Sequence, residues 1–162
     1  MAKLTVATVG IYVASLETFL AALAKADVGL VLDVRQRRGV RGREYAWANS
    51  LRLQSALLDA SIGYRHHREL APTTELRRLQ YREDDRLGEG KRSRTALAPE
   101  YRRRYVGEIL DGVDLDAFAA SLPREHASAL LCVERDARAC HRSLIAQRLE
   151  AEHGARVVDL LA

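Results

Sequence analysis

The strongest constraint on the fold is an alternation of short apolar runs with segments of helical periodicity. One apolar run ends at Val9, a second covers Leu30–Val34 and a third covers Ala129–Val133, and each has the length of a buried strand. Between the first two runs, apolar residues recur at helical spacing, at Leu16, Phe19, Leu20 and Leu23. This order of strand, helix and strand predicts right-handed crossovers and a parallel sheet.

Two further strands complete the expected sheet, at Ser61–His67 and Val157–Leu160. Capping residues or a proline indicate where helices begin, at Ser15, Asn49, Pro99 and Asp136. We therefore predict a single-domain, three-layer α/β/α fold with a mainly parallel sheet of about five strands. Five residues of the strands are expected to be fully buried: Val6, Val31, Leu32, Leu130 and Leu131.

The size and composition fit one domain over residues 1–162, because 162 residues can bury a core and 48% of them are hydrophobic. No apolar stretch approaches the roughly 18–20 residues needed to span a membrane. The N-terminus runs directly into a strand pattern without a signal peptide. Only two cysteines occur, which suits a reducing compartment. We expect a cytoplasmic protein with no membrane partner.

An irregular polar insertion is expected at about 71–98, between the third and fourth strands. A short helix can begin at Pro72–Thr74 and stop at Gly88, and the segment Gly88–Arg94 has the composition of a mobile loop. A long polar connection inside a compact domain is usually functional or disordered. Its position in the chain allows it to fold over the carboxyl edge of the sheet.

Chemically active side chains gather where the run at Ala129–Val133 passes into the C-terminal helical pattern. Cys132 and Glu134 follow the strand, and Cys140–Arg142 lie close to the start of the helix. In α/β sheets, ligands bind beyond the carboxyl ends of the strands. The segment therefore marks a candidate site.

Five short motifs resemble those of the DUF488 family, a domain family of unknown function, and occur in the same order along the chain. They are Thr8–Gly10, Asp33–Arg35, Gly63–His66, Cys132-x-Glu134 and Cys140–Arg142. The resemblance implies an α/β fold and a site at the strand ends. It implies no particular reaction, and the cofactor is unknown.

The strand ends bring eight candidate site residues to one edge of the predicted sheet. Those with catalytic chemistry are Cys140, His141, Glu134 and Cys132, and those expected to bind a ligand are Asp33, Arg35, Arg142 and His66. Because buried charges persist only when they are paired, we expect Asp33, Arg35, Glu134 and Arg142 to meet in one polar cluster.

Cys140 is the preferred nucleophile if the site is catalytic. We expect it in the first turn of the C-terminal helix, where the helix dipole lowers the pKa of a thiol, with His141 as its neighbouring base. The alternative is that both cysteines are inert core residues. Cys132 and Arg138 have the spacing of the phosphatase loop, but the segment lacks that loop's glycines and carries Glu134 and Asp136, so a phosphatase is excluded.

His66 or His67 could in principle form a zinc site with Cys132, Cys140 and His141. No closely spaced ligand pair such as Cys-x-x-Cys is present, so no metal site is predicted.

Basic residues leave two main functions open. The chain has 26 lysines and arginines, of which 23 are arginines, and a net charge of +4. The arginine codons of a GC-rich genome would give the same excess of arginine.

Arginine binds phosphate bidentately, so an anionic small molecule or nucleotide is the leading ligand. A nucleic-acid-binding module using Arg35–Arg43 and Arg77–Arg104 is the alternative, separable by its steep salt dependence. A redox sensor using Cys132 and Cys140 is a third, weaker interpretation. The oligomeric state is unknown.

Overall fold

The sheet organises the structure, a computed structural model that describes residues 2–161. Its five strands are all parallel, in the order β3-β2-β4-β1-β5. Their bounds are Thr5–Val9 (β1), Val28–Asp33 (β2), Gly63–His66 (β3), Ala127–Leu131 (β4) and Arg156–Asp159 (β5). The predicted fold class is confirmed, and the sheet is wholly rather than mainly parallel.

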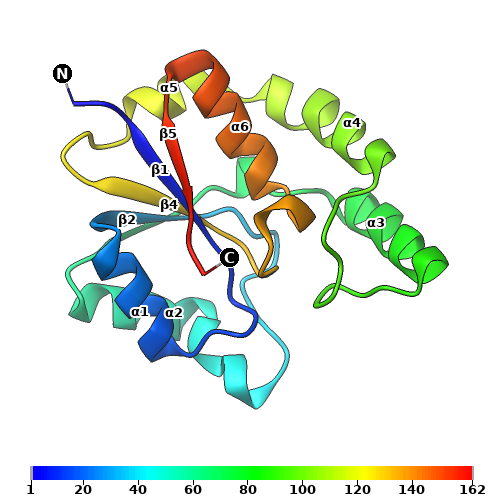
Figure 1. The fold of residues 1–162 in the computed structure, drawn as a ribbon, viewed down its shortest axis with the longest axis horizontal. Coiled ribbons are helices and arrows are strands. Elements are labelled where there is room, and N and C mark those ends of the chain that lie inside the picture. The colour runs from blue at the N-terminus through cyan, green and yellow to red at the C-terminus, as the bar shows by residue number, and fades with distance from the viewer. Residues whose placement is uncertain (1, 162) are drawn as a thin grey trace.

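Helices cover both faces of the sheet. In Figure 1, α1 (Leu16–Lys25) and α2 (Ser50–Asp59) lie on one side of the strands, and α5 (Leu115–Ala120) and α6 (Arg142–His153) lie on the other. Helix α1 contacts β2, α2 contacts β3, and α6 contacts β1, β4 and β5. This distribution is the one that right-handed crossovers produce when the chain moves first toward β3 and then back toward β5.

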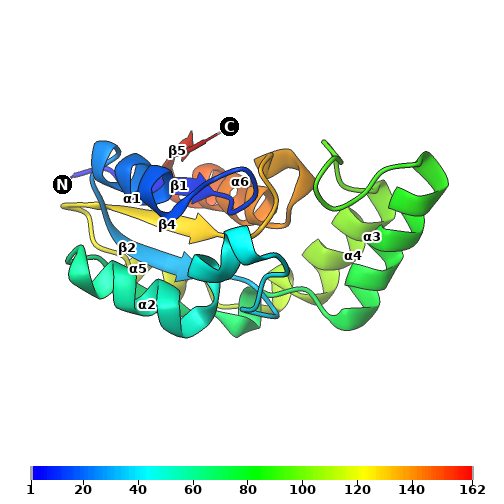
Figure 2. The same cartoon turned by 90° about the horizontal axis from the view of Figure 1, so that it is seen from below.

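Two more helices, α3 (Thr74–Leu87) and α4 (Pro99–Glu108), lie at one end of the molecule. Figure 2 shows the arrowheads of β2 and β4 pointing toward them, so they stand at the carboxyl edge of the sheet. Thr73 caps α3 through its side chain, and Gly88 ends it in the left-handed conformation, at φ 70°. The short helix expected from Pro72–Thr74 to Gly88 is therefore present, and it makes much of the segment 71–98 regular.

The core follows the sequence pattern closely. All five residues expected to be fully buried are 0% exposed: Val6, Val31, Leu32, Leu130 and Leu131. Short 3₁₀ turns connect the larger elements, at Arg43–Ala48 (η1), Arg68–Leu70 (η2), Leu110–Gly112 (η3) and Ala137–Ala139 (η4). Within residues 2–161, no helix combines the length and apolar character needed to cross a membrane.

The predicted start of the C-terminal helix is wrong by several residues. Asp136 caps the turn η4, where its side chain accepts from the N–H of Arg138, and α6 begins only at Arg142. Cys140 lies between the two elements in extended backbone, at φ −142° and ψ 148°. It is therefore outside the helix, two residues before its first residue.

The chain beyond β4 stays attached to the edge of β1. The carbonyl of Val133 accepts from the N–H groups of Ile11 and Tyr12, at 3.1 and 3.0 Å. Gly10 makes this approach possible, because a Cβ at that position would lie 2.0 Å from the carbonyl oxygen of Glu134. This packing fixes the loop that carries Cys132 and Glu134.

Candidate functional site

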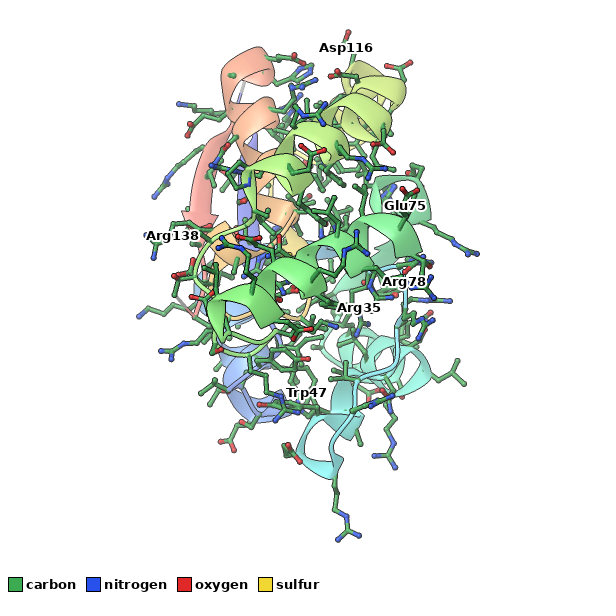
Figure 3. The ribbon with its side chains drawn as sticks, turned by 90° about the vertical axis from the view of Figure 1, so that its right-hand side faces the viewer. Arg35, Trp47, Glu75, Arg78, Asp116 and Arg138 are labelled. Atoms are coloured by element: carbon green, nitrogen blue, oxygen red, sulfur yellow. The ribbon has the colours of Figure 1, made fainter. Side chains whose placement is uncertain are left out.

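A cavity of about 690 Å³ lies at the carboxyl ends of β2 and β4. Its walls come from the loop after β2, from α3, from the loop between α3 and α4, and from the segments around Cys132 and Cys140. Figure 3 faces this end of the molecule, with Arg35 below α3 and Trp47 farther down. Of the eight candidate residues, five line the cavity: Arg35, Cys132, Glu134, Cys140 and His141.

A buried group of Cys132, Cys140 and His141 forms the floor of the cavity. The Nδ1 atom of His141 lies 3.6 Å from the Sγ of Cys140 and 4.0 Å from the Sγ of Cys132. On the other side of the ring, Nε2 lies 2.8 Å from the carbonyl oxygen of Val34. Because a carbonyl only accepts, Nε2 carries a proton, and in the neutral imidazole the Nδ1 lone pair faces both thiols.

The two thiols are not equivalent. A hydrogen bond with Cys140 and burial together raise the pKa of Cys132 to about 12, so Cys132 stays protonated near neutral pH. Cys140 is nearer to His141, but its position before α6 removes the expected support from the first turn of the helix. Both free cysteines are buried and both contact the cavity.

Asp33 and Arg35 form a buried bidentate ion pair. The Nε of Arg35 donates to Oδ1 of Asp33 at 2.9 Å, and Nη2 donates to Oδ2 at 2.8 Å. The third nitrogen, Nη1, donates to the carbonyl of Ala48, and the hydroxyl of Tyr64 donates to Asp33 at 2.6 Å. Asp33 does not line the cavity, and its role in the structure is to position Arg35.

The expected cluster of Asp33, Arg35, Glu134 and Arg142 is wrong, because the side chain of Glu134 pairs with Arg94. Nη2 of Arg94 donates to Oε1 of Glu134 at 2.7 Å, and Nη1 donates to Asp84 at 2.6 Å. The predicted four-residue cluster is thus divided, with Asp33 and Arg35 in one buried group and Glu134 in another. Burial raises the pKa of Glu134.

Arg142 binds backbone rather than the cavity. Its guanidinium donates to the carbonyls of Glu134 and Arg135, at 2.7 and 3.1 Å, and it does not line the cavity. His66 also lies outside the cavity wall, and its Nε2 is 2.9 Å from the carbonyl oxygen of Arg35. His67 instead pairs with Glu69 at 2.7 Å. These residues support the site without facing it.

Sequence reasoning missed Arg94, which is buried and binds three groups. Besides Asp84 and Glu134, its Nε donates to the carbonyl of Ala139 at 3.0 Å, next to Cys140. Asp84 is in turn held by Gln80, one helical turn earlier, at 2.9 Å. The spacing of Gln80 and Asp84 was a weak signal, but nothing in the sequence separates Arg94 from the arginines around it.

The cavity wall is strongly basic. Seven basic residues line it, Arg35, Arg37, Arg41, Arg77, Lys91, Arg92 and Arg94, and Glu134 is its only acidic residue. Within the described chain, Arg37, Arg41, Arg77 and Lys91 form no ion pair with a carboxylate. Arg77 donates to the side chains of Gln36 and Tyr81, at 2.8 and 3.0 Å, which hold it at the wall. The mouth therefore has an uncompensated positive charge.

Comparison with known proteins identifies a family but no closer relative. The family model described as "Domain of unknown function DUF488" matches residues 15–149, which include every residue of the cavity wall except Tyr12. No curated protein and no solved structure matches the chain.

Proposed function

Because the chain belongs to the DUF488 family, whose function is unknown, we propose a function from its cavity: it binds an anionic, phosphate-bearing small molecule at the carboxyl edge of the sheet. The observation that carries the proposal is the excess of basic over acidic residues in the wall, where the single carboxylate, Glu134, is already bound by Arg94. Guanidinium groups bind phosphate oxygens through paired hydrogen bonds.

The shape of the site favours a small molecule. A volume of about 690 Å³ falls within the range of roughly 300–1,000 Å³ that is usual for small-molecule pockets. Aromatic surface is present as well, from Tyr12, Tyr81 and Tyr101. A nucleotide or a sugar phosphate combines an anionic group with a body of matching size.

We place the chemistry at the floor of the cavity, where Cys132, Cys140 and His141 lie, together with Glu134 of the same cavity wall. Cys140 remains the preferred thiol, because it is nearer to His141 and because the raised pKa of Cys132 keeps that residue protonated. Glu134, which stands beside them, is available for proton transfer. These roles make the protein enzyme-like, with the basic wall directing the anion toward the floor.

The alternative, a nucleic-acid surface, is less well supported by the arginines of α3 and α4. Several of them are bound to carboxylates on their own helices: Arg86 to Glu83, Arg103 to Glu100 and Arg104 to Glu108. Arg94 is buried. Four basic groups without an acidic partner among the described residues line the cavity: Arg37, Arg41, Arg77 and Lys91.

Two adjacent arginines on α3 provide the test. Arg77 lines the cavity, whereas Arg78 is exposed, is absent from the cavity wall and is labelled on the outer side of α3 in Figure 3. Loss of one charge-assisted hydrogen bond costs about 1.5–3 kcal/mol, so Arg77→Ala should weaken pyrophosphate binding roughly 10- to 100-fold. Arg78→Ala removes the same charge and should change the affinity less than about 2-fold.

Isothermal titration calorimetry measures the affinity of both variants for inorganic pyrophosphate. Equal losses in both would show binding to the general surface charge and contradict the proposal. Tight binding of a single-stranded oligonucleotide, with a steep salt dependence and no response to Arg77→Ala, would support the nucleic-acid alternative.

A further inference from the structure

The floor of the cavity has the dimensions of a three-ligand metal site. The Sγ atoms of Cys132 and Cys140 and the Nδ1 atom of His141 all lie within 4.8 Å of one another. In a tetrahedral zinc site, bonds of about 2.3 Å to sulfur and 2.0–2.1 Å to nitrogen place these two ligand atoms about 3.6 Å apart. The observed S···N separations are 3.6 and 4.0 Å, so each differs from that value by no more than about 0.4 Å.

His141 is already oriented as a metal ligand. Its Nε2–H donates to the carbonyl of Val34 at 2.8 Å, which leaves the Nδ1 lone pair directed at the thiols. A ligating histidine almost always makes such a hydrogen bond through its other nitrogen. The ring of Tyr105 packs against the imidazole, with the centroids 5.4 Å apart, and holds it in place.

A buried oxygen without a partner gives an independent indication of a ligand. Oε2 of Glu134 has no hydrogen-bond partner among the described residues, although Glu134 is only 5% exposed. Glu134 lines the same cavity as the three ligand residues. A buried acceptor of this kind requires a donor from a water or a ligand.

Two basic side chains of the cavity wall, Arg35 and Arg94, are already paired with buried carboxylates. Arg94 faces two buried carboxylates, of Asp84 and Glu134, and Arg35 faces Asp33. A divalent cation would neutralise two thiolates, which removes the cost of burying their charge.

From these observations, we propose that Cys132, Cys140 and His141 bind a divalent zinc-type metal ion, with the fourth coordination position open to the cavity. Two thiolates and one imidazole are a ligand set that zinc uses in catalytic sites, where water or substrate takes the fourth position. A metal-bound water is the donor that Oε2 of Glu134 lacks. The basic wall stands around the same opening, so an anionic ligand entering the cavity meets the open position.

The spacing of the ligands explains why the sequence does not reveal the site. Cys132 directly follows β4, whereas Cys140 and His141 lie between η4 and α6, and the turn η4 brings them back to Cys132. The metal site depends only on these three residues and not on the basic wall. It can therefore be tested with a metal alone, and its failure would leave pyrophosphate binding untouched.

Cobalt provides the probe, because thiolate ligation gives a charge-transfer band and tetrahedral geometry gives intense visible bands. Metal-free protein is kept reduced with a phosphine, which prevents a disulfide between the two cysteines, and is titrated with Co²⁺. We expect one Co²⁺ per chain with both spectral features, displaced by one equivalent of Zn²⁺. Cys132→Ser, Cys140→Ser and His141→Gln should each lower the affinity at least about 100-fold, since even loss of an outer partner costs about 10- to 100-fold.

His153→Gln is the matched control. His153 belongs to an outer group with Asp116 and Glu152, and Figure 3 labels Asp116 at the end of the molecule opposite Trp47. That variant should keep the full spectrum. No charge-transfer band in the reduced wild-type protein, or a band that survives loss of either cysteine, would overturn the proposal.

A measurement on the wild-type protein covers the case in which a variant does not fold. Zn²⁺ should protect both thiols of the native, reduced protein from iodoacetamide. Equal alkylation rates with and without Zn²⁺ would equally overturn the site.

Discussion

Replacing Arg94 with alanine should destabilise the protein severely. The guanidinium of Arg94 is bound to Asp84 at 2.6 Å, to Glu134 at 2.7 Å and to the carbonyl of Ala139 at 3.0 Å. All three charged side chains are at least 93% buried, so Arg94→Ala leaves two carboxylates without a cation and away from water. Breaking a buried ion pair from one side costs about 3–5 kcal/mol, and we expect a loss of this size in the free energy of unfolding.

Urea denaturation followed by circular dichroism measures that free energy. Arg92→Ala, two residues away, is the control, because Arg92 is exposed and lies 3.9 Å from an equally exposed Glu44. Its loss should cost less than about 1 kcal/mol. If Arg94→Ala also costs less than about 1 kcal/mol, Arg94 does not hold the α3–α4 loop against the floor of the cavity. The claim that Glu134 depends on Arg94 as its buried ionic partner is then refuted.

Three further predictions follow from local structure. Gly10→Ala should cost about 1–3 kcal/mol or more in urea denaturation because its Cβ would strike the backbone of Glu134, whereas Gly107→Ala in α4, with nothing within 4 Å, should stabilise by up to about 1 kcal/mol. The ion pair with Arg138 lowers the pKa of Asp136, so Asp136→Asn should cost about 0.2–1 kcal/mol at neutral pH. That difference should fade in denaturation curves as the pH falls below 3.8, the ordinary pKa, and through the folded-state value. In metal-free protein, mass spectrometry should find Cys140 alkylated faster than Cys132 between about pH 6 and 8, because Cys132 is held as a thiol; the reverse order would contradict its raised pKa.

Local signals in the sequence were sufficient for most of the fold. Ser15 caps α1 and Pro99 begins α4, as predicted, because capping and proline effects act within a few residues. The start of α6 could not be predicted in this way. His141 precedes the helix without a side-chain capping bond, while the better capping residue, Asp136, is used by the short turn η4.

The grouping of five candidate residues around one cavity was predictable, but the ionic partner of Glu134 was not. The strand ends correctly placed Arg35, Cys132, Glu134, Cys140 and His141 around one cavity, since parallel strands present their carboxyl ends at one edge. The partner of Glu134 comes from forty residues earlier in the chain, on a loop whose course depends on the packing of α3 and α4. Such contacts are set by tertiary structure, so composition and spacing carry no trace of them.

The most direct test of the central claim is a crystal structure of the protein grown with tungstate, a phosphate analogue that is located by its anomalous scattering. We expect a tungstate peak inside the cavity, within hydrogen-bonding distance of basic side chains of the wall such as Arg77 and Arg41. Tungstate bound only at outer arginines such as Arg78, with none in the cavity, would contradict an anion site at the carboxyl edge of the sheet.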